Sequence, residues 1–220
     1  MIRFNNVSKF YDNHTVLKNV SLDIEKGEMI FITGPSGAGK STLLKLMYLA
    51  ERPDEGDITV GDFHLASLSN ARIPKLRRSV GVVFQDFKLI NNQTIYDNVA
   101  LALRIRRVPE KDIRNVVSEA LKLVYLRHKA ESYPKSLSGG EQQRVVIARA
   151  IAAEPKVILA DEPTGNLDPN TAVDIVRLFK DINIQGTTIL IATHNRELFR
   201  NTGKRVLKLD SGTIIGEEAG

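Results

Sequence analysis

The chain has 220 residues, a formal net charge of +5 and no cysteine. The lack of cysteine excludes disulfides and thiolate metal sites, so any metal must be held by oxygen ligands or histidine. No run approaches the roughly 18 apolar residues of a membrane span, and the start lacks a targeting pattern, so we expect a soluble, cytoplasmic protein.

The beginning of the chain predicts antiparallel strands. Ile2 to Val7 and Val20 to Ile24 alternate between apolar and polar residues, and Glu25 to Glu28 has the composition of a turn. Further short strands are expected at Asp57 to Val60 and Val80 to Phe84.

Three other runs are short, apolar and rich in β-branched residues, as buried parallel strands are. They cover Met29 to Thr33, Lys156 to Ala160, and Thr187 to Ala192. Helices are expected after two of them, at Lys40 to Ala50 and Pro169 to Ile182. This alternation predicts an α/β sheet core.

From about Thr94 to Ala153 the strand pattern stops, and apolar residues recur at helical spacing. We interpret this region as a helical lobe inserted into the sheet domain. The last residues predict a hairpin of Val206 to Leu209 and Thr213 to Ile215.

A glycine-rich run directly after the first buried strand is the strongest motif of the chain. It fits the phosphate-binding P-loop and opens a helix, which is the context that the motif requires. Its amides can wrap the β- and γ-phosphates, Lys40 can bring a positive charge to them, and the Ser41 hydroxyl can hold Mg²⁺. The alternative is a glycine-rich turn before a helix. The run is Gly34, Pro35, Ser36, Gly37, Ala38, Gly39, Lys40, Ser41 and Thr42.

Polar side chains follow three of the predicted strands, at the sheet edge where parallel sheets bind ligands. Asp161 and Glu162 end the second buried strand; we expect Asp161 to hold Mg²⁺ and Glu162 to accept a proton from the attacking water. His194 follows the third strand and can reach the γ-phosphate, although a lone histidine there is also a common turn residue. Gln85 follows Val80 to Phe84 and can contact Mg²⁺ or the water; a solvent-exposed glutamine is the alternative.

A second phosphate-type site is indicated at Ser138, Gly139, Gly140 and Glu141. Ser138 and Glu141 have the spacing of a capping box, so a helix should begin here. The two glycines let an anion approach bare amides at the positive end of that helix. The alternative is a capped helix with a flexible entry.

Two further residues have both a structural and a functional interpretation. Asp168 precedes Pro169 and is first a helix N-cap with proline at the first helical position. Tyr11 can stack on an adenine ring, although a tyrosine near an early strand is more often a packing residue.

Taken in order, these motifs resemble the nucleotide-binding subunit of ABC systems over nearly the whole chain. The resemblance implies one ABC ATP-binding domain: a P-loop NTPase (RecA-like) α/β core over 1–86 and 154–220, with an N-terminal antiparallel β subdomain and an inserted α-helical lobe at about 87–153. It also implies ATPase activity with Mg²⁺ as cofactor. It further implies an ATP-dependent homodimer in which the signature of one subunit, Ser138 to Glu141, closes over the ATP on the P-loop of the other.

The resemblance also implies roles for single residues. Tyr11 stacks on adenine, and Gly34 to Thr42 bind phosphate. Ser138 and Gly140 contact the γ-phosphate, and Gly139, Glu141 and Asp168 are further ATP-binding residues. Glu162 is the general base, and His194 clamps the γ-phosphate. The metal ligands are Ser41, Gln85 and Asp161.

Within the family, Phe84 to Leu89, Thr94 to Ala100 and Asp161 to Asp168 look like the cell-division group, and the lipoprotein-release and macrolide-export group shares Pro163 to Asp168. That resemblance implies an integral membrane partner of the FtsX type, a peripheral location on the inner face of the plasma membrane, and control of peptidoglycan hydrolysis. We expect Phe87, Leu89 and Ile90 to form an apolar docking surface for the partner; the alternative is that they pack inside the lobe.

Three alternatives remain open at this point. The ATPase of a lipoprotein-release or macrolide-export transporter shares the same motifs. A soluble ABC ATPase acting on nucleic acid or ribosomes would fit the basic charge, but the usual second cassette, coiled-coil arms and zinc modules are missing, so no nucleic-acid partner is expected. A clamp that binds ATP and scarcely hydrolyses it is the third.

Overall fold

The structure, a computed structural model, describes residues 1–12 and 14–220, and these residues form two sheets. The antiparallel sheet has the order β2-β1-β4-β5, with β1 (Ile2–Tyr11), β2 (His14–Ile24), β4 (Glu55–Val60) and β5 (Phe63–His64). The other sheet has the order β10-β9-β3-β8-β7-β6. It contains β3 (Met29–Thr33), β6 (Val80–Val83), β7 (Val157–Asp161), β8 (Thr188–Ala192), β9 (Arg205–Asp210) and β10 (Thr213–Ala219).

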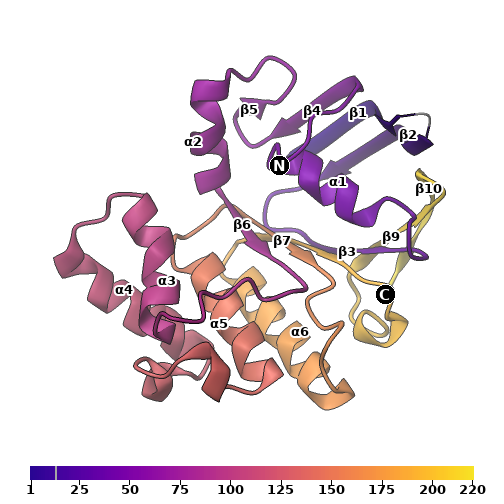
Figure 1. The fold of residues 1–220 in the computed structure, drawn as a ribbon. Helices are drawn as coiled ribbons and strands as arrows, with labels where there is room; N and C mark the ends of the chain where they lie inside the picture. Colours follow the sequence, from indigo (N-terminus) through magenta and orange to yellow (C-terminus); the bar gives the residue numbers. More distant parts are fainter. Residues whose placement is uncertain (13) are drawn as a thin grey trace.

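The larger sheet is parallel from β6 to β9, and β10 is added antiparallel to β9 as a hairpin. Figure 1 shows α1 on one side of this sheet and α5 and α6 on the other. The helices are α1 (Lys40–Met47), α2 (Ile73–Arg78), α3 (Ile95–Ile105), α4 (Glu110–Leu123), α5 (Gly139–Ile151) and α6 (Pro169–Ile184). Short 3₁₀ turns cover Asn70–Arg72, Arg127–Lys129, Pro134–Ser136 and Arg196–Leu198.

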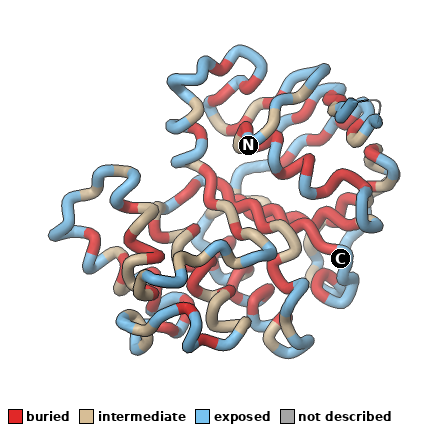
Figure 2. The backbone as a smooth tube through the Cα atoms, viewed as in Figure 1, coloured by how far each residue is buried: buried red, intermediate tan, exposed pale blue. Residues whose placement is uncertain are grey.

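The central strand β3 divides the core into two layers. Phe31 packs with α3 to α6, whereas Ile30 and Ile32 pack with α1 and the antiparallel sheet, because successive side chains point to opposite faces. All three are fully buried, and burial of each such side chain stabilises the folded state by about 1.5–3 kcal/mol. The buried backbone accordingly runs through the middle of the molecule in Figure 2.

The predicted fold class is confirmed, as are the parallel strands and the terminal hairpin. The stretch 94–153 holds only helices and turns, as expected, while the division into core and lobe at 87 and 153 stays a prediction. No described helix is long and apolar enough to cross a membrane.

Some boundaries differ from the sequence expectation. The first two strands are longer and reach Tyr11 and His14. Helix α1 ends at Met47 instead of Ala50, because Leu49 takes a left-handed φ of 52°. Strand β5 and helix α2 were not predicted; both are too short to produce a periodic pattern.

Candidate functional site

A pocket of about 750 Å³ lies where β3, β7 and β8 end. The P-loop follows β3, Glu162 follows β7 and His194 follows β8, so the parallel sheet brings the three together. Its lining contains most of the predicted site and two residues that were not predicted, His14 and Val16. The lining residues are Tyr11, His14, Val16, Pro35, Ser36, Gly37, Gly39, Lys40, Ser41, Thr42, Gln85, Glu162 and His194.

Gly39 is one of the positions at which the P-loop requires glycine. Gly39 has φ 104°, and a Cβ there would lie 2.8 Å from the Val16 carbonyl oxygen, so a side chain would clash with β2. The next residue, Lys40, opens α1 and is buried; its Nζ donates to the carbonyl oxygens of Gly34 (2.8 Å) and Pro35 (3.0 Å). The lysine therefore stands at the mouth of the loop whose amides can bind phosphate.

The two carboxylates after β7 have different environments. Asp161 Oδ1 accepts a hydrogen bond from the Ser41 hydroxyl at 3.0 Å. Burial raises the pKa of Asp161; the Ser41 hydrogen bond opposes this rise, and the nearby Glu162 adds to it. An ionised Asp161 in this position favours a cation beside it.

Glu162 is fixed through one of its oxygens. Its Oε1 accepts from the His194 backbone N–H at 3.1 Å, lies 2.8 Å from His194 Nδ1 and 4.0 Å from Lys40 Nζ. Its Oε2 is buried and, among the described residues, has no hydrogen-bond partner. One oxygen is thus held in place while the other is free to accept a proton.

The site fits Mg²⁺ by the chemistry of its donors. The Ser41 hydroxyl and the Asp161 carboxylate are hard oxygen ligands 3.0 Å apart, and the Gln85 side chain lines the same pocket. Magnesium in nucleotide sites is typically held by one or two such protein oxygens together with phosphates and waters.

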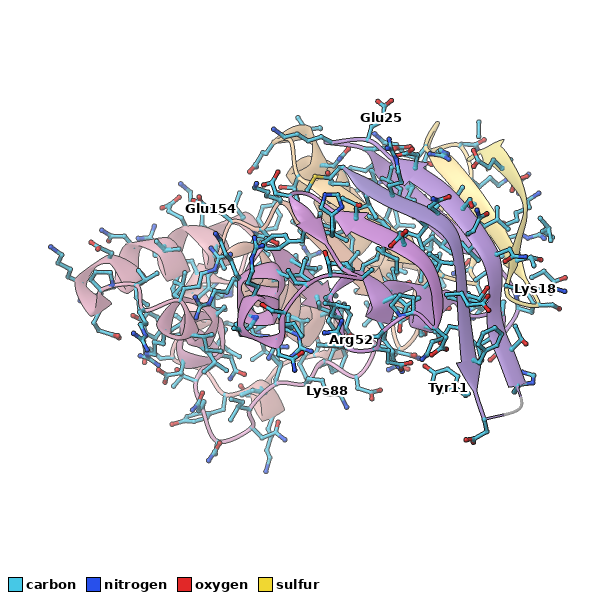
Figure 3. The ribbon with its side chains drawn as sticks, turned by 90° about the horizontal axis from the view of Figure 1, so that it is seen from above. Tyr11, Lys18, Glu25, Arg52, Lys88 and Glu154 are labelled. Carbon is cyan, nitrogen blue, oxygen red and sulfur yellow. The ribbon has the colours of Figure 1, made fainter. Side chains whose placement is uncertain are left out.

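Tyr11 lies at the outer end of β1, where it pairs with His14 of β2 (Figure 3). Its side chain is exposed, and Lys9 Nζ lies 5.3 Å from the ring centroid. His14 and Val16 could have been found from the same hairpin, because His14 pairs with Tyr11 and Val16 lies two residues further along β2.

Ser138 starts α5 with a complete capping box. Its Oγ accepts from the Glu141 N–H at 3.3 Å, and the Glu141 carboxylate accepts from the Ser138 N–H at 3.0 Å. Lys129 forms an ion pair with Glu141, and this hydrogen bond together with the capping bond lowers the pKa of Glu141. The predicted capping box and helix start at Ser138 are thereby confirmed.

The structure does not bring the signature and the P-loop together within one chain. In the described part of the chain, none of Ser138, Gly139, Gly140 and Glu141 lines the pocket. They pack instead beside the start of α6: a Cβ on Gly140 would lie 2.5 Å from Thr171 Cγ2, and one on Gly139 would lie 3.5 Å from Leu167. A side chain at Gly140 would therefore fit only if Thr171 moved.

Asp168 is also placed outside the pocket. It is the N-cap of α6, and its carboxylate accepts from the Thr171 N–H at 3.1 Å. Hydrogen bonding from Thr171 lowers the pKa of Asp168.

The expected apolar docking surface is only partly available. Phe87 and Leu89 are half-buried and pack against the core, which was the alternative for them, and Ile90 is half-buried. A groove of about 460 Å³ lies nearby, between α2, β6, α3 and α5. It combines apolar side chains, Phe84 and Ile105 among them, with four arginines: Arg77, Arg78, Arg106 and Arg149.

Comparison with known proteins identifies the family. The model for the ABC transporter domain matches residues 17–165. The cell division ATP-binding protein FtsE of Streptococcus pneumoniae is 46% identical, over 100% of this chain and 96% of its own length. The protein of the same name from Escherichia coli is 48% identical, over 98% of each chain. A dimeric ATP-binding cassette in a post-hydrolysis state, bound to ADP and Pi, superimposes with a TM-score of 0.90 at 38% identity, over 100% of this chain and 98% of the other.

Proposed function

The chain belongs to the ABC transporter family of ATP-binding subunits, and from this premise we propose that it hydrolyses ATP between two copies of itself to drive a membrane partner in cell division. The observation that carries the proposal is the division of the phosphate-binding motifs. One pocket holds the P-loop, Glu162 and His194, while the signature lies outside it in the described residues of the same chain.

Binding of the phosphates is assigned to the P-loop. Its amides, at the start of α1, surround the β- and γ-phosphates, and Lys40 exchanges its bonds to the Gly34 and Pro35 carbonyls for the phosphate oxygens. Tyr11, at the exposed end of β1, supplies a ring on which adenine can stack.

Hydrolysis is assigned to the groups at the ends of β7 and β8. His194 fixes Glu162 Oε1, and the unpaired Oε2 accepts the proton of the attacking water. In addition to holding Glu162, His194 contacts the γ-phosphate. Ser41, Asp161 and Gln85 would hold Mg²⁺, which when bound supplies positive charge to the phosphate oxygens.

The second copy completes the site. A head-to-tail arrangement places Ser138, Gly139 and Gly140 of one copy over the ATP on the P-loop of the other, with Asp168 at the shared boundary. The dimeric cassette with ADP and Pi supports this arrangement, because it superimposes on this chain over its full length. The amides at the start of α5 then meet the γ-phosphate at the positive end of a helix dipole.

The membrane partner is proposed to be of the FtsX type, which would keep this chain on the inner face of the plasma membrane. The names of the relatives support the link to cell division. We place the docking site in the groove between α2 and α3, because Phe87 and Leu89 are occupied by packing. Arg77 and Arg106 there donate to backbone carbonyl oxygens, and among the described residues neither pairs with a carboxylate. An apolar partner helix carrying acidic side chains fits this lining.

The test is co-purification and ATPase stimulation with the FtsX-type membrane protein of the same cell. The groove variant Ile105→Asp should lose binding and stimulation while keeping its basal ATPase activity, whereas Ile184→Asp, an exposed isoleucine at the end of α6, should keep both. Normal binding by Ile105→Asp would refute the docking site. Stimulation by a lipoprotein-release or macrolide-export membrane subunit instead would favour the transporter alternative.

A further inference from the structure

The segment that follows Gln85 is fastened to the helical region by two side chains. Arg149 of α5 donates from Nη1 to the Lys88 carbonyl oxygen at 2.7 Å and from Nη2 to the Phe87 carbonyl oxygen at 2.9 Å. Asn98 of α3 is fully buried; it donates to the carbonyl oxygens of Ile90 (3.1 Å) and Thr94 (2.9 Å) and accepts from the Ile90 N–H (2.8 Å). Residues 87–94 are therefore attached to α5 and α3.

The two residues that Arg149 holds are in an uncommon backbone conformation. Phe87 has φ 33° and Lys88 has φ 51°, and two successive left-handed residues other than glycine persist only where their surroundings hold them. The Lys88 side chain is exposed (Figure 3) and, among the described residues, forms an ion pair only with Asp86, two residues earlier. The planar guanidinium of Arg149, with two parallel donors, is the group that can bind both carbonyls at once.

In the described part of the chain, the Arg149 side chain interacts with these two carbonyl oxygens and not with a carboxylate. Burial lowers the pKa of Arg149, and among the described residues no carboxylate lies within ion-pair distance of it. A half-buried cation without an acidic partner is costly unless its donors are satisfied, and the Phe87 and Lys88 carbonyls satisfy two of them.

The same segment touches the start of α5. The Phe87 ring comes within 3.9 Å of the Cβ position of Gly139, in the signature. Arg149 lies ten residues further along that helix, about 15 Å at 1.5 Å per residue. The segment thus contacts α5 near both ends, so the two are expected to move as one body.

The connection between this segment and the parallel sheet lies just before Phe87. Strand β6 ends at Val83, and Gln85 and Asp86 are exposed. Gln85 lines the nucleotide pocket, and its Nε2 lies 3.1 Å from the Cβ position of Gly165, in the loop after β7. Figure 1 shows the chain leaving β6 and crossing in front of α5 and α3.

We propose that Arg149 is a positioning residue that locks the Phe87–Lys88 backbone to α5, so that a displacement of Gln85 by a ligand in the pocket moves Ser138 to Gly140 into place for the second copy. The inference rests on the proposed function. Arg149 itself touches neither nucleotide nor the reacting atoms; it acts through the segment that it holds.

The experiment separates ATP binding from dimerisation in a Glu162→Gln background. Titration with a fluorescent ATP analogue measures the affinity of one chain, and light scattering after size exclusion measures the ATP-dependent dimer. Arg149→Ala should bind ATP within twofold of the parent and require at least tenfold more protein to dimerise. Arg149→Lys, with one ammonium for two carbonyls, should recover part of the loss. Arg104→Ala, a matched control on α3 that pairs with Asp97 and Glu110, should behave as the parent.

Parental dimerisation by Arg149→Ala would overturn the inference and leave the proposed function intact. An equal loss of ATP affinity and dimerisation would also overturn it, because a general structural defect has that signature. If Arg149→Ala does not fold, Arg149→Lys decides: a reduced dimer at parental ATP affinity supports the inference, and a parental dimer overturns it. A parent that binds ATP without dimerising would overturn both proposals.

Discussion

Replacing Glu162 by glutamine isolates proton acceptance from the other features of the site. The amide oxygen can still accept from the His194 N–H, which lies 3.1 Å from Oε1 in the present structure, so the loop after β7 should keep its shape. The substitution removes the basic Oε2, which is buried and without a partner among the described residues. A positioned general base contributes about 10²- to 10⁴-fold to a rate. At 1.36 kcal/mol for each factor of ten, this corresponds to about 3–5 kcal/mol of the barrier.

We therefore expect the kcat of phosphate release for Glu162→Gln to fall by about 10²- to 10⁴-fold, with ATP affinity within threefold of the parent. The closed dimer should accumulate in the presence of ATP, because the step that opens it is blocked. Glu119→Gln on α4, an exposed glutamate that in the described part of the chain pairs only with Lys122, is the control and should be silent. A kcat within threefold of the parent would refute the assignment of Glu162 as base.

Three further substitutions address phosphate binding, the carboxylate beside Ser41 and the helix cap. Lys40→Ala should weaken ATP binding by about 10- to 150-fold, the worth of a hydrogen bond to a charged group of about 1.5–3 kcal/mol, as titration calorimetry would show; unchanged affinity would remove Lys40 from the phosphate site. Because burial raises the pKa of Asp161 above its ordinary value of 3.8, its ionised form opposes folding once the pH exceeds the folded pKa. Asp161→Asn should thus raise the melting temperature of the nucleotide-free protein at pH 7, and the gain should shrink as the pH falls through the raised folded pKa and vanish below the unfolded one. An equal gain at pH 7 and at low pH would contradict that reasoning. Ser138→Ala should cost about 1 kcal/mol, or roughly 2–4 °C by calorimetry, through loss of the cap to Glu141; no shift would mean that the capping box is dispensable.

Much of the site could be predicted because it depends on local order along the chain. The P-loop, Asp161, Glu162 and His194 each directly follow a buried strand, and parallel strands must present their carboxyl ends at one edge. The capping box at Ser138 is equally local, since both partners lie within one helical turn.

Other features depend on contacts between distant parts of the chain and left little trace in the sequence. Arg149 binds the carbonyls of Phe87 and Lys88, which lie 62 and 61 residues earlier in the chain. A basic residue on a helix is usually a surface residue. Phe87 and Leu89 appeared available for docking because a short apolar run gives no indication of which side chain turns inward. The groove near Ile105 is formed by four elements together, so no single run of the sequence encodes it.

The central claim is that the P-loop of one copy and the signature of another share one ATP. The chain has no cysteine, so Ser36→Cys and Ser138→Cys each introduce a single thiol at an exposed position. The two variants, mixed and treated with a short bismaleimide, should form a covalent heterodimer with ATP in the Glu162→Gln background, and much less of it with ADP or without nucleotide. Absence of this ATP-dependent product from the mixture, while each variant still binds ATP, would contradict the shared site.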